Sequence, residues 1–289
     1  MKKIVCFILC SLCLLTSACG GRSSENQEYV IRKDAIDFYG YSLEETKLKS
    51  ADKFKEDEVL VEAQKIIYED VVTKIALKIK NDTDKPLKFL AANLSVNGLM
   101  WSGSLLYTAE AKTENEAFIE ISNEWFSAMQ IEMIDQVEFL VKVFNEKDDE
   151  IMQSGVLKIK TDAPSSYEQK YDDSGFEIYN EGGIRLLARH IQKSAHSDNQ
   201  ELVFYIENNT KSAISVMSDN VRVNGKKIEP LFVMSVGAGK KAVDTMVFYD
   251  ADLKDINVSE IKTVGASFKA FDESLKTVFE TKVTEAYVS

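Results

Sequence analysis

The chain has 289 residues and a formal net charge of −12, with 47 acidic and 35 basic residues. This acidic excess argues against a nucleic-acid-binding protein and against one that reads anionic membranes through a basic patch. Hydrophobic residues make up 45% of the chain, which excludes a wholly disordered protein. The length allows one large domain or two of medium size.

All four cysteines lie near the N-terminus, at Cys6, Cys10, Cys13 and Cys19. Lys2 and Lys3 precede an apolar stretch over residues 4–15, which is typical of a secretory signal peptide. The stretch is too short to span a bilayer, because a membrane-spanning helix needs about 18 residues or more. We therefore predict that residues 1–18 are a signal peptide.

The predicted signal peptide ends at Ala18, which is followed by Cys19 and Gly20. A small residue before a cysteine, directly after an apolar run, resembles the lipobox of bacterial lipoproteins, although Thr16 stands where that motif usually has Leu. The resemblance implies that Cys19 becomes a lipidated N-terminus outside the cytoplasmic membrane and that residues 19–30 form a flexible tether. Ordinary cleavage after Ala18, which would leave Cys19 free, is the alternative.

Little catalytic chemistry remains in the mature chain predicted in this way. Its single cysteine is used for lipidation, so no thiol is left for a disulfide, a nucleophile or a metal site. The sequence contains neither a Gly-x-Ser-x-Gly motif nor a P-loop. We predict a protein that is not an enzyme, with no catalytic residue, no cofactor and no metal. Loss of Lys2 and Lys3 would change the net charge from −12 to −14.

An internal repeat runs through the chain at one constant offset, without gaps, so that residue 78 matches residue 205 and residue 93 matches residue 220. Residues 78–83 and 205–210 share an Asn-x-Thr ending, and residues 93–98 and 220–225 share an Asn-Gly ending. A period this long indicates tandem globular domains, because solenoid repeats are much shorter.

The repeat places two copies at about 59–160 and 186–287. We accordingly assign residues 31–163 to domain 1, residues 164–175 to a linker and residues 176–289 to domain 2.

Both copies show the alternation of half-buried β-strands. Ile75, Leu77 and Ile79 alternate with lysines, and copy two has apolar residues at the matching positions. The Asn97-Gly98 and Asn224-Gly225 pairs favour type I′ hairpins, and a phase change before each pair indicates a bulge. We predict an all-β chain of two tandem immunoglobulin-like β-sandwiches, each with about seven strands and a short crossing helix.

The crossing helix is expected at residues 124–133 in copy one and at residues 251–256 in copy two. Asp250 is positioned to cap the second of these helices. A capping-box spacing over residues 42–45 predicts a further short helix before copy one.

Four segments of copy two carry a family resemblance: residues 206–210, 221–225, 238–242 and 268–271. Together they resemble an uncharacterised immunoglobulin-like domain that recurs in surface lipoproteins and other envelope proteins of Firmicutes. Copy one matches less well, because Lys112-Thr113-Glu114 replaces the Gly-Lys-Lys loop of copy two. The resemblance implies an envelope location, in keeping with a Gram-positive source, and supplies no catalytic residues.

Two clusters of metal-type ligands have simpler interpretations. His190 and His196 lie near Asp198, but zinc sites need three or four ligands, so histidines on a strand face or in solvent are favoured. Asp250, Asp252 and Asp255 resemble the start of a calcium loop, but Asp255 stands where such a loop needs Gly and Ile261 where it needs Glu, so a helix cap with solvated charges is favoured.

Three aromatic residues of copy one are candidate ligand-binding residues: Trp101, Tyr107 and Trp125. The two tryptophans have no aromatic counterpart in copy two, so they could form a contact surface for glycan or peptide. Partial burial in the sandwich or against the other domain is the alternative.

These observations predict a lipid-anchored extracytoplasmic protein with a non-catalytic binding role. The expected partners are the membrane, through the lipid, and an unknown protein or glycan, with no nucleic acid. A structural or assembly component of an envelope complex is the alternative function, and an unrecognised hydrolase is a more distant one.

Overall fold

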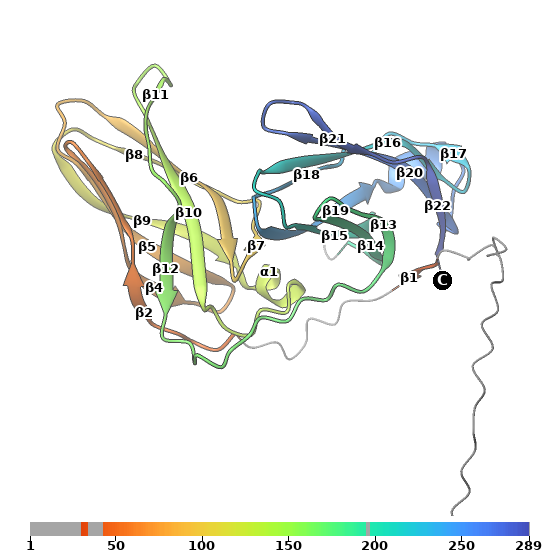
Figure 1. Cartoon of the computed structure of the whole chain (residues 1–289), viewed down its shortest axis with the longest axis horizontal. Coiled ribbons are helices and arrows are strands. Elements are labelled where there is room, and N and C mark those ends of the chain that lie inside the picture. The colour runs from red at the N-terminus through yellow and green to blue at the C-terminus, as the bar shows by residue number, and fades with distance from the viewer. Residues whose placement is uncertain (1–29, 34–42, 195–196, 289) are drawn as a thin grey trace, which may run out of the picture.

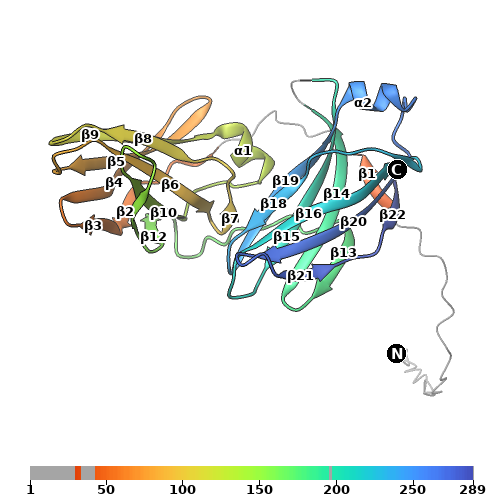
Figure 2. The same ribbon diagram turned by 90° about the horizontal axis from the view of Figure 1, so that it is seen from above.

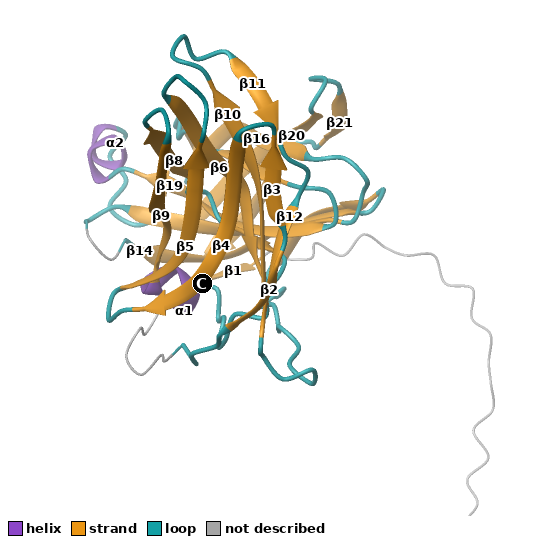
Figure 3. Cartoon of the chain, turned by 90° about the vertical axis from the view of Figure 1, so that its left-hand side faces the viewer, coloured by secondary structure: helices purple, strands orange, loops and turns teal. Residues whose placement is uncertain are grey.

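The computed structural model describes residues 30–33, 43–194 and 197–288. The predicted signal peptide, Cys19 and the tether up to residue 29 lie outside these residues. The described chain is all-β, with two short helices at the edges of the strands (Figure 3). Neither helix has the length and apolar character that crossing a membrane requires, within the ranges described.

The first unit contains eleven strands and one helix: β2 Leu48–Ala51, β3 Lys53–Glu56, β4 Val59–Tyr68, β5 Val72–Asn81, β6 Leu87–Val96, β7 Leu99–Met100, β8 Leu105–Ala109, β9 Thr113–Ser122, α1 Asn123–Ala128, β10 Gln136–Phe144, β11 Glu150–Gln153 and β12 Leu157–Thr161. One antiparallel sheet has the order β3-β4-β5-β9. The other runs β2-β12-β10-β6-β8, with β7 and β11 as short hairpin extensions.

The second unit contains the remaining strands and helix: β1 Val30–Lys33, β13 Phe176–Glu181, β14 Ile184–Lys193, β15 Gln200–Asn208, β16 Ile214–Val223, β17 Lys226–Lys227, β18 Val233–Val236, β19 Lys240–Phe248, α2 Asp250–Asp255, β20 Thr263–Asp272, β21 Thr277–Glu280 and β22 Thr284–Val288. Its sheets run β13-β14-β15-β19 and β22-β20-β16-β18. Figures 1 and 2 show the two units side by side along the long axis of the molecule.

Each unit has its own hydrophobic core between its two sheets. In the first unit, Leu77 from one sheet and Phe89 from the other belong to the same buried cluster. In the second unit, Phe204 and Phe268 do the same, with their ring centroids 5.3 Å apart. The alternation expected from the sequence is confirmed, and each such buried side chain contributes about 1.5–3 kcal/mol through burial.

The sequence repeat recurs in the hydrogen bonds of the structure. Asn81 Nδ2 donates to the carbonyls of Lys85, Ala109 and Glu110 at 2.8–3.2 Å, and its Oδ1 accepts from Thr83. Asn208 makes the same set of bonds to the residues that the repeat aligns with these partners: Ser212, Val236, Gly237 and Thr210. Both asparagine side chains are buried and close the turn between two strands.

The Asn-Gly hairpins also form as predicted, with positive φ at Asn97, Gly98, Asn224 and Gly225. In both units the asparagine side chain bonds to the segment that leads into the next central strand, β10 or β20. A register shift precedes each hairpin, so the predicted bulge is confirmed as well.

The crossing helices are shorter or placed differently than predicted. Helix α1 ends at Ala128, well before residue 133, because Gln130 adopts a positive φ that stops the helix. Helix α2 begins at Asp250 itself, so the predicted cap is wrong: Tyr249 is the N-cap and the Asp250 carboxylate pairs with Lys254. The helix predicted over residues 42–45 is absent from the described residues 43–45, where Glu44 bridges to Met133; Ser42 lies outside them.

Strand β1 departs from the sequence-based division of the chain. That division assigns residues 31–33 to domain 1 and residue 30 to the tether, but β1 pairs in parallel with β14 and β22 of the second unit. The N-terminal strand therefore bridges the two sheets of the unit that lies further along the chain. Strand β22 is an edge strand, and β14 pairs with β13 only up to Ala188, so its stretch at His190 and Ile191 is open to β1. A local sequence pattern does not reveal such free backbone groups.

Candidate functional site: a groove between the two units

The two units are joined by a short piece of β-sheet. Strand β7 pairs in parallel with β19, and the Lys241 backbone amide donates to the Gly98 carbonyl at 3.0 Å. Apolar side chains cross the boundary in both directions: Met100 packs against the second core and Val243 against the first. The units consequently share packing as well as backbone hydrogen bonds.

Charged and polar contacts surround this junction. Glu138, whose side chain is only 7% exposed, forms ion pairs with Lys158 of its own unit, at 3.1 Å, and with Lys240 of the second unit. From the segment between the units, Tyr171 donates a hydrogen bond to the Asn97 carbonyl at 2.6 Å. These contacts connect the two units and the segment between them.

A groove of about 430 Å³ lies beside the junction, between β6, the loop after β7, β18 and β19. Its volume is within the usual range for small-ligand sites. Figures 1 and 2 show β7, β18 and β19 meeting where the two units touch. The lining residues are Leu90, Ala92, Asn93, Met100, Trp101, Ser102, Gly103, Ser104, Val233, Met234, Ser235, Ala242, Val243 and Asp244.

Trp101 supplies the aromatic wall of the groove. Its backbone amide donates to the Leu94 carbonyl at 2.8 Å, directly after the β6–β7 hairpin. The indole lies over Gly103, where an added Cβ atom would collide with the ring. A larger residue at position 103 would have to displace the ring, so the position of the indole depends on glycine in this loop.

Asp244 supplies the only carboxylate among these lining residues. It shares the core-facing row of β19 with Ala242, Met246 and Phe248, and it pairs directly opposite Phe204. Burial among apolar groups raises the pKa of Asp244, and a hydrogen bond from the Thr245 amide offsets this only in part. Within the described part of the chain, no Lys or Arg forms an ion pair with this carboxylate.

Sequence reasoning did not single out Asp244, although a signal was present. The repeat aligns it with Ala117, which is buried in the first core. The sequence signal for Asp244 is a carboxylate in the core-facing row of a predicted strand, at a position where the other copy of the repeat has alanine.

A smaller pocket of about 210 Å³ adjoins the groove and shares Asn93, Met100 and Ser235 with it. Its lining adds two more carboxylates, Asp272 and Glu273. No Lys or Arg is found among the lining residues of either pocket.

The three predicted aromatic residues do not line one pocket. All three are partly buried against the first core. Trp101 lines the groove, whereas Tyr107 lies on β8 opposite Phe89, and Trp125 packs edge to face on Phe126 at 5.3 Å. The prediction that they form a ligand-binding surface stays a prediction, with Trp101 the residue that reaches the groove.

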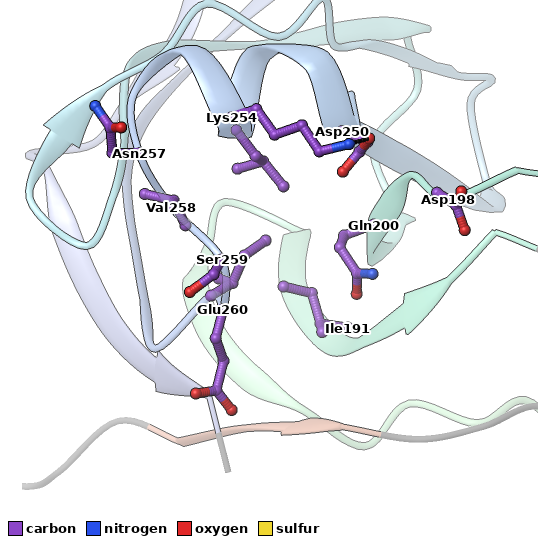
Figure 4. A pocket seen from close by; sticks show the side chains of 11 residues that line it. Ile191, Asp198, Gln200, Asp250, Lys254, Asn257, Val258, Ser259 and Glu260 are labelled. Atoms are coloured by element: carbon purple, nitrogen blue, oxygen red, sulfur yellow. Dashed lines mark hydrogen bonds and ion pairs between the residues drawn. The ribbon is translucent and has the colours of Figure 1, made fainter.

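A pocket of about 610 Å³ lies elsewhere, between α2 and strands β14 and β15 (Figure 4). Two of its carboxylates, Asp250 and Asp198, differ from Asp244 because lysines lie next to them. Lys254 is 2.6 Å from Asp250, and Lys193 is 2.7 Å from Asp198. The hydrogen bond from Lys193 lowers the pKa of Asp198, so this pocket carries its own counter-ions.

The histidine and aspartate clusters have separate outcomes. His190 is buried on β14, with its Nε2 3.1 Å from Gln192 Oε1, and His196 lies outside the described residues. Asp252 and Asp255 are exposed on α2. Among the described residues, no group of three or more His, Cys, Asp or Glu side chains is arranged to hold a metal ion.

Comparisons with known proteins identify no family. No family model and no curated protein matches the sequence. Among solved structures, the crystal structure of red sea bream transglutaminase is similar over 81% of this chain and 32% of that chain, with 8% sequence identity and a TM-score of 0.24. The chain thus spans about a third of that protein's length, and a likeness this weak identifies neither a fold family nor an activity.

Proposed function

We propose that this chain is a lipid-anchored, extracytoplasmic binding protein without catalytic activity, built from two tandem immunoglobulin-like sandwiches. The observation that carries the binding role is the groove at the junction, which Trp101 of one unit and Asp244 of the other both line. A site assembled from both units requires them to be held in a fixed orientation, and the shared β7–β19 pairing supplies this.

Three features support the rest of the proposal. The apolar stretch before Cys19 supports export and lipidation. The two cores, each between two antiparallel sheets, support the sandwich assignment. The repeat aligns strands of the first unit with strands of the second, such as β6 with β16, which supports a tandem pair of one domain type.

The anchoring is tested by replacing the lipid-accepting residue. The Cys19→Ser variant is expected to lose incorporation of radiolabelled palmitate and to leave the membrane fraction, because its side chain lacks the sulfur that carries the lipid. The matched control is Cys13→Ser, which lies inside the predicted signal peptide and is expected to stay labelled and membrane-bound. Labelling that persists in Cys19→Ser would contradict the anchor.

A further inference from the structure

We propose that the groove binds an alkylammonium group, carried either by a small polyamine or by a lysine side chain. This inference rests on the proposed binding function and names the ligand class of the same site. Three features carry it: the charge of the lining, the aromatic wall and the continuity of the groove with its smaller neighbour.

The charge of the lining favours a cation. Asp244 brings a negative charge to the groove from a core-facing position, where the first unit has Ala117. Asp244 is half-buried, and partial removal of a carboxylate from water is costly unless a partner compensates it, which no described Lys or Arg does. A cationic ligand supplies the missing partner in the bound state.

The wall of the groove suits the chain that carries such a cation. Trp101, Met100 and Leu90 present apolar surface on which methylene groups can pack. The face of an indole also attracts an ammonium group directly, which adds about 0.5–2 kcal/mol in other proteins. The indole of Trp101 lies over Gly103, so its position is coupled to that of the loop, which favours a preformed surface.

The neighbouring pocket extends the same chemistry. Asp272 and Glu273 lie beyond Asn93, Met100 and Ser235, which line both pockets. A ligand with two ammonium groups separated by methylenes can pair with Asp244 at one end and with these carboxylates at the other. Diamines and polyamines are therefore expected to bind more tightly than a monoamine of the same length.

A neutral sugar fits these observations less well. It can stack on Trp101, but its hydroxyl groups leave the charge of Asp244 uncompensated. The pocket beside α2 provides the contrast, because Lys254 and Lys193 already pair with two of its acidic residues, Asp250 and Asp198.

The test is a calorimetric titration of the chain from residue 20 onward. The probes are spermidine, 1,5-diaminopentane, n-pentylamine, Nα-acetyl-lysine amide with its side-chain ammonium free, glucose and N-acetylglucosamine. Spermidine and the diamine are expected to bind at least tenfold more tightly than n-pentylamine, and binding is expected to weaken as NaCl screens the ion pair. Tighter binding of Nα-acetyl-lysine amide than of the free amines would identify a lysine side chain as the source of the ammonium group.

The variants separate the groove from the rest of the surface. Asp244→Asn is expected to weaken spermidine binding at least tenfold, whereas Asp252→Asn, which removes an exposed carboxylate of α2, is expected to leave it unchanged. In the single-tryptophan variant Trp125→Phe, the remaining fluorescence of Trp101 is expected to shift when spermidine binds.

The outcomes distinguish the ligand class from the function. A neutral sugar that binds through Trp101, with no response to Asp244→Asn, would overturn the alkylammonium inference and leave the binding function intact. No binding of any amine at millimolar concentration would also overturn the inference. Soluble chain that is never lipidated in cells would refute the anchored function whatever the amines do.

Discussion

Asp244 is half-buried and lies on the face of β19 that also carries the core residues Ala242, Met246 and Phe248. Its neighbours along the inward row of β19 are apolar, and the matching residue of the first unit is Ala117. The folded protein thus holds a carboxylate where alanine is compatible with the same strand. Charged residues that weaken a fold in this way are typical of binding sites, because function and stability are selected separately.

We predict that this carboxylate gives the stability of the protein a definite pH dependence. Burial raises the folded-state pKa of Asp244 above its ordinary value of 3.8, so the folded state holds the proton to higher pH than the unfolded state does. The destabilising effect of the charge is therefore complete above the folded-state pKa and vanishes below the unfolded-state pKa.

Asp244→Asn is accordingly expected to be more stable than the wild type at pH 7, with the difference disappearing near pH 3. Urea unfolding at a series of pH values measures this. Asp252→Asn serves as the control, because its carboxylate is exposed. A stability difference that grows toward acid pH would contradict the sign.

At the level of single elements, β1 has the most unexpected position. It runs parallel to both β14 and β22, so it adds backbone hydrogen bonds to the second unit from a segment that precedes the first. The repeat aligns β22 with β12 of the first unit, and there β2 lies beside β12 but runs antiparallel to it. The strand added next to β12 or β22 therefore comes from a different segment in each unit and runs in the opposite direction relative to its neighbour.

Removal of residues 20–33 is expected to lower the stability of the second unit by about 2 kcal/mol, since each backbone hydrogen bond contributes about 0.5–1.5 kcal/mol net. Amide hydrogen exchange measures the loss of protection at Tyr287 and over the stretch His190–Ile191, which pair with β1, whereas the Val288 amide donates to the Lys262 carbonyl and is expected to stay protected. The edge formed by β2 and β12 in the first unit is the internal control. Unchanged exchange at Tyr287 and at both His190 and Ile191 would show that β1 does not stabilise this edge.

The whole molecule depends on how the two units meet. In the proposed anchoring, Cys19 is eleven residues before β1, a distance of at most about 40 Å when extended. Because β1 belongs to the second unit, that unit would lie nearest the membrane and the first unit would project away from it. The order of the units along the chain alone would place the first unit nearest the membrane.

The ion pair between Glu138 and Lys240 is expected to hold this arrangement. Lys240→Ala should broaden the distance distribution between spin labels attached at the exposed positions Val71 and Leu275. It should also cost about 2 kcal/mol of stability, less than a fully unpaired buried charge because Lys158 remains. Electron paramagnetic resonance measures the distribution in the chain from residue 20 onward, which contains no native cysteine.

Lys158→Ala is the matched control for this experiment. It removes the partner of Glu138 that belongs to the first unit, so the label distances are expected to stay narrow. Equal broadening in both variants would show that the cross-unit pair has no special role in orientation.

The sequence by itself determined the strands, the repeat and the turns. Their signals are local: alternating side chains, Asn-Gly pairs at positive φ, and Asn81 and Asn208 at matching turns. It also pointed to Trp101, because this aromatic residue is specific to one copy.

Only the tertiary structure decided the position of β1, the junction between the units and the presence of Trp101 and Asp244 in the lining of one groove. These features depend on which strand edges remain open after each unit has folded. Edge pairing uses backbone groups common to all residues, so side-chain patterns do not encode it. The groove then follows from that pairing, because it brings together residues from separate copies of the repeat.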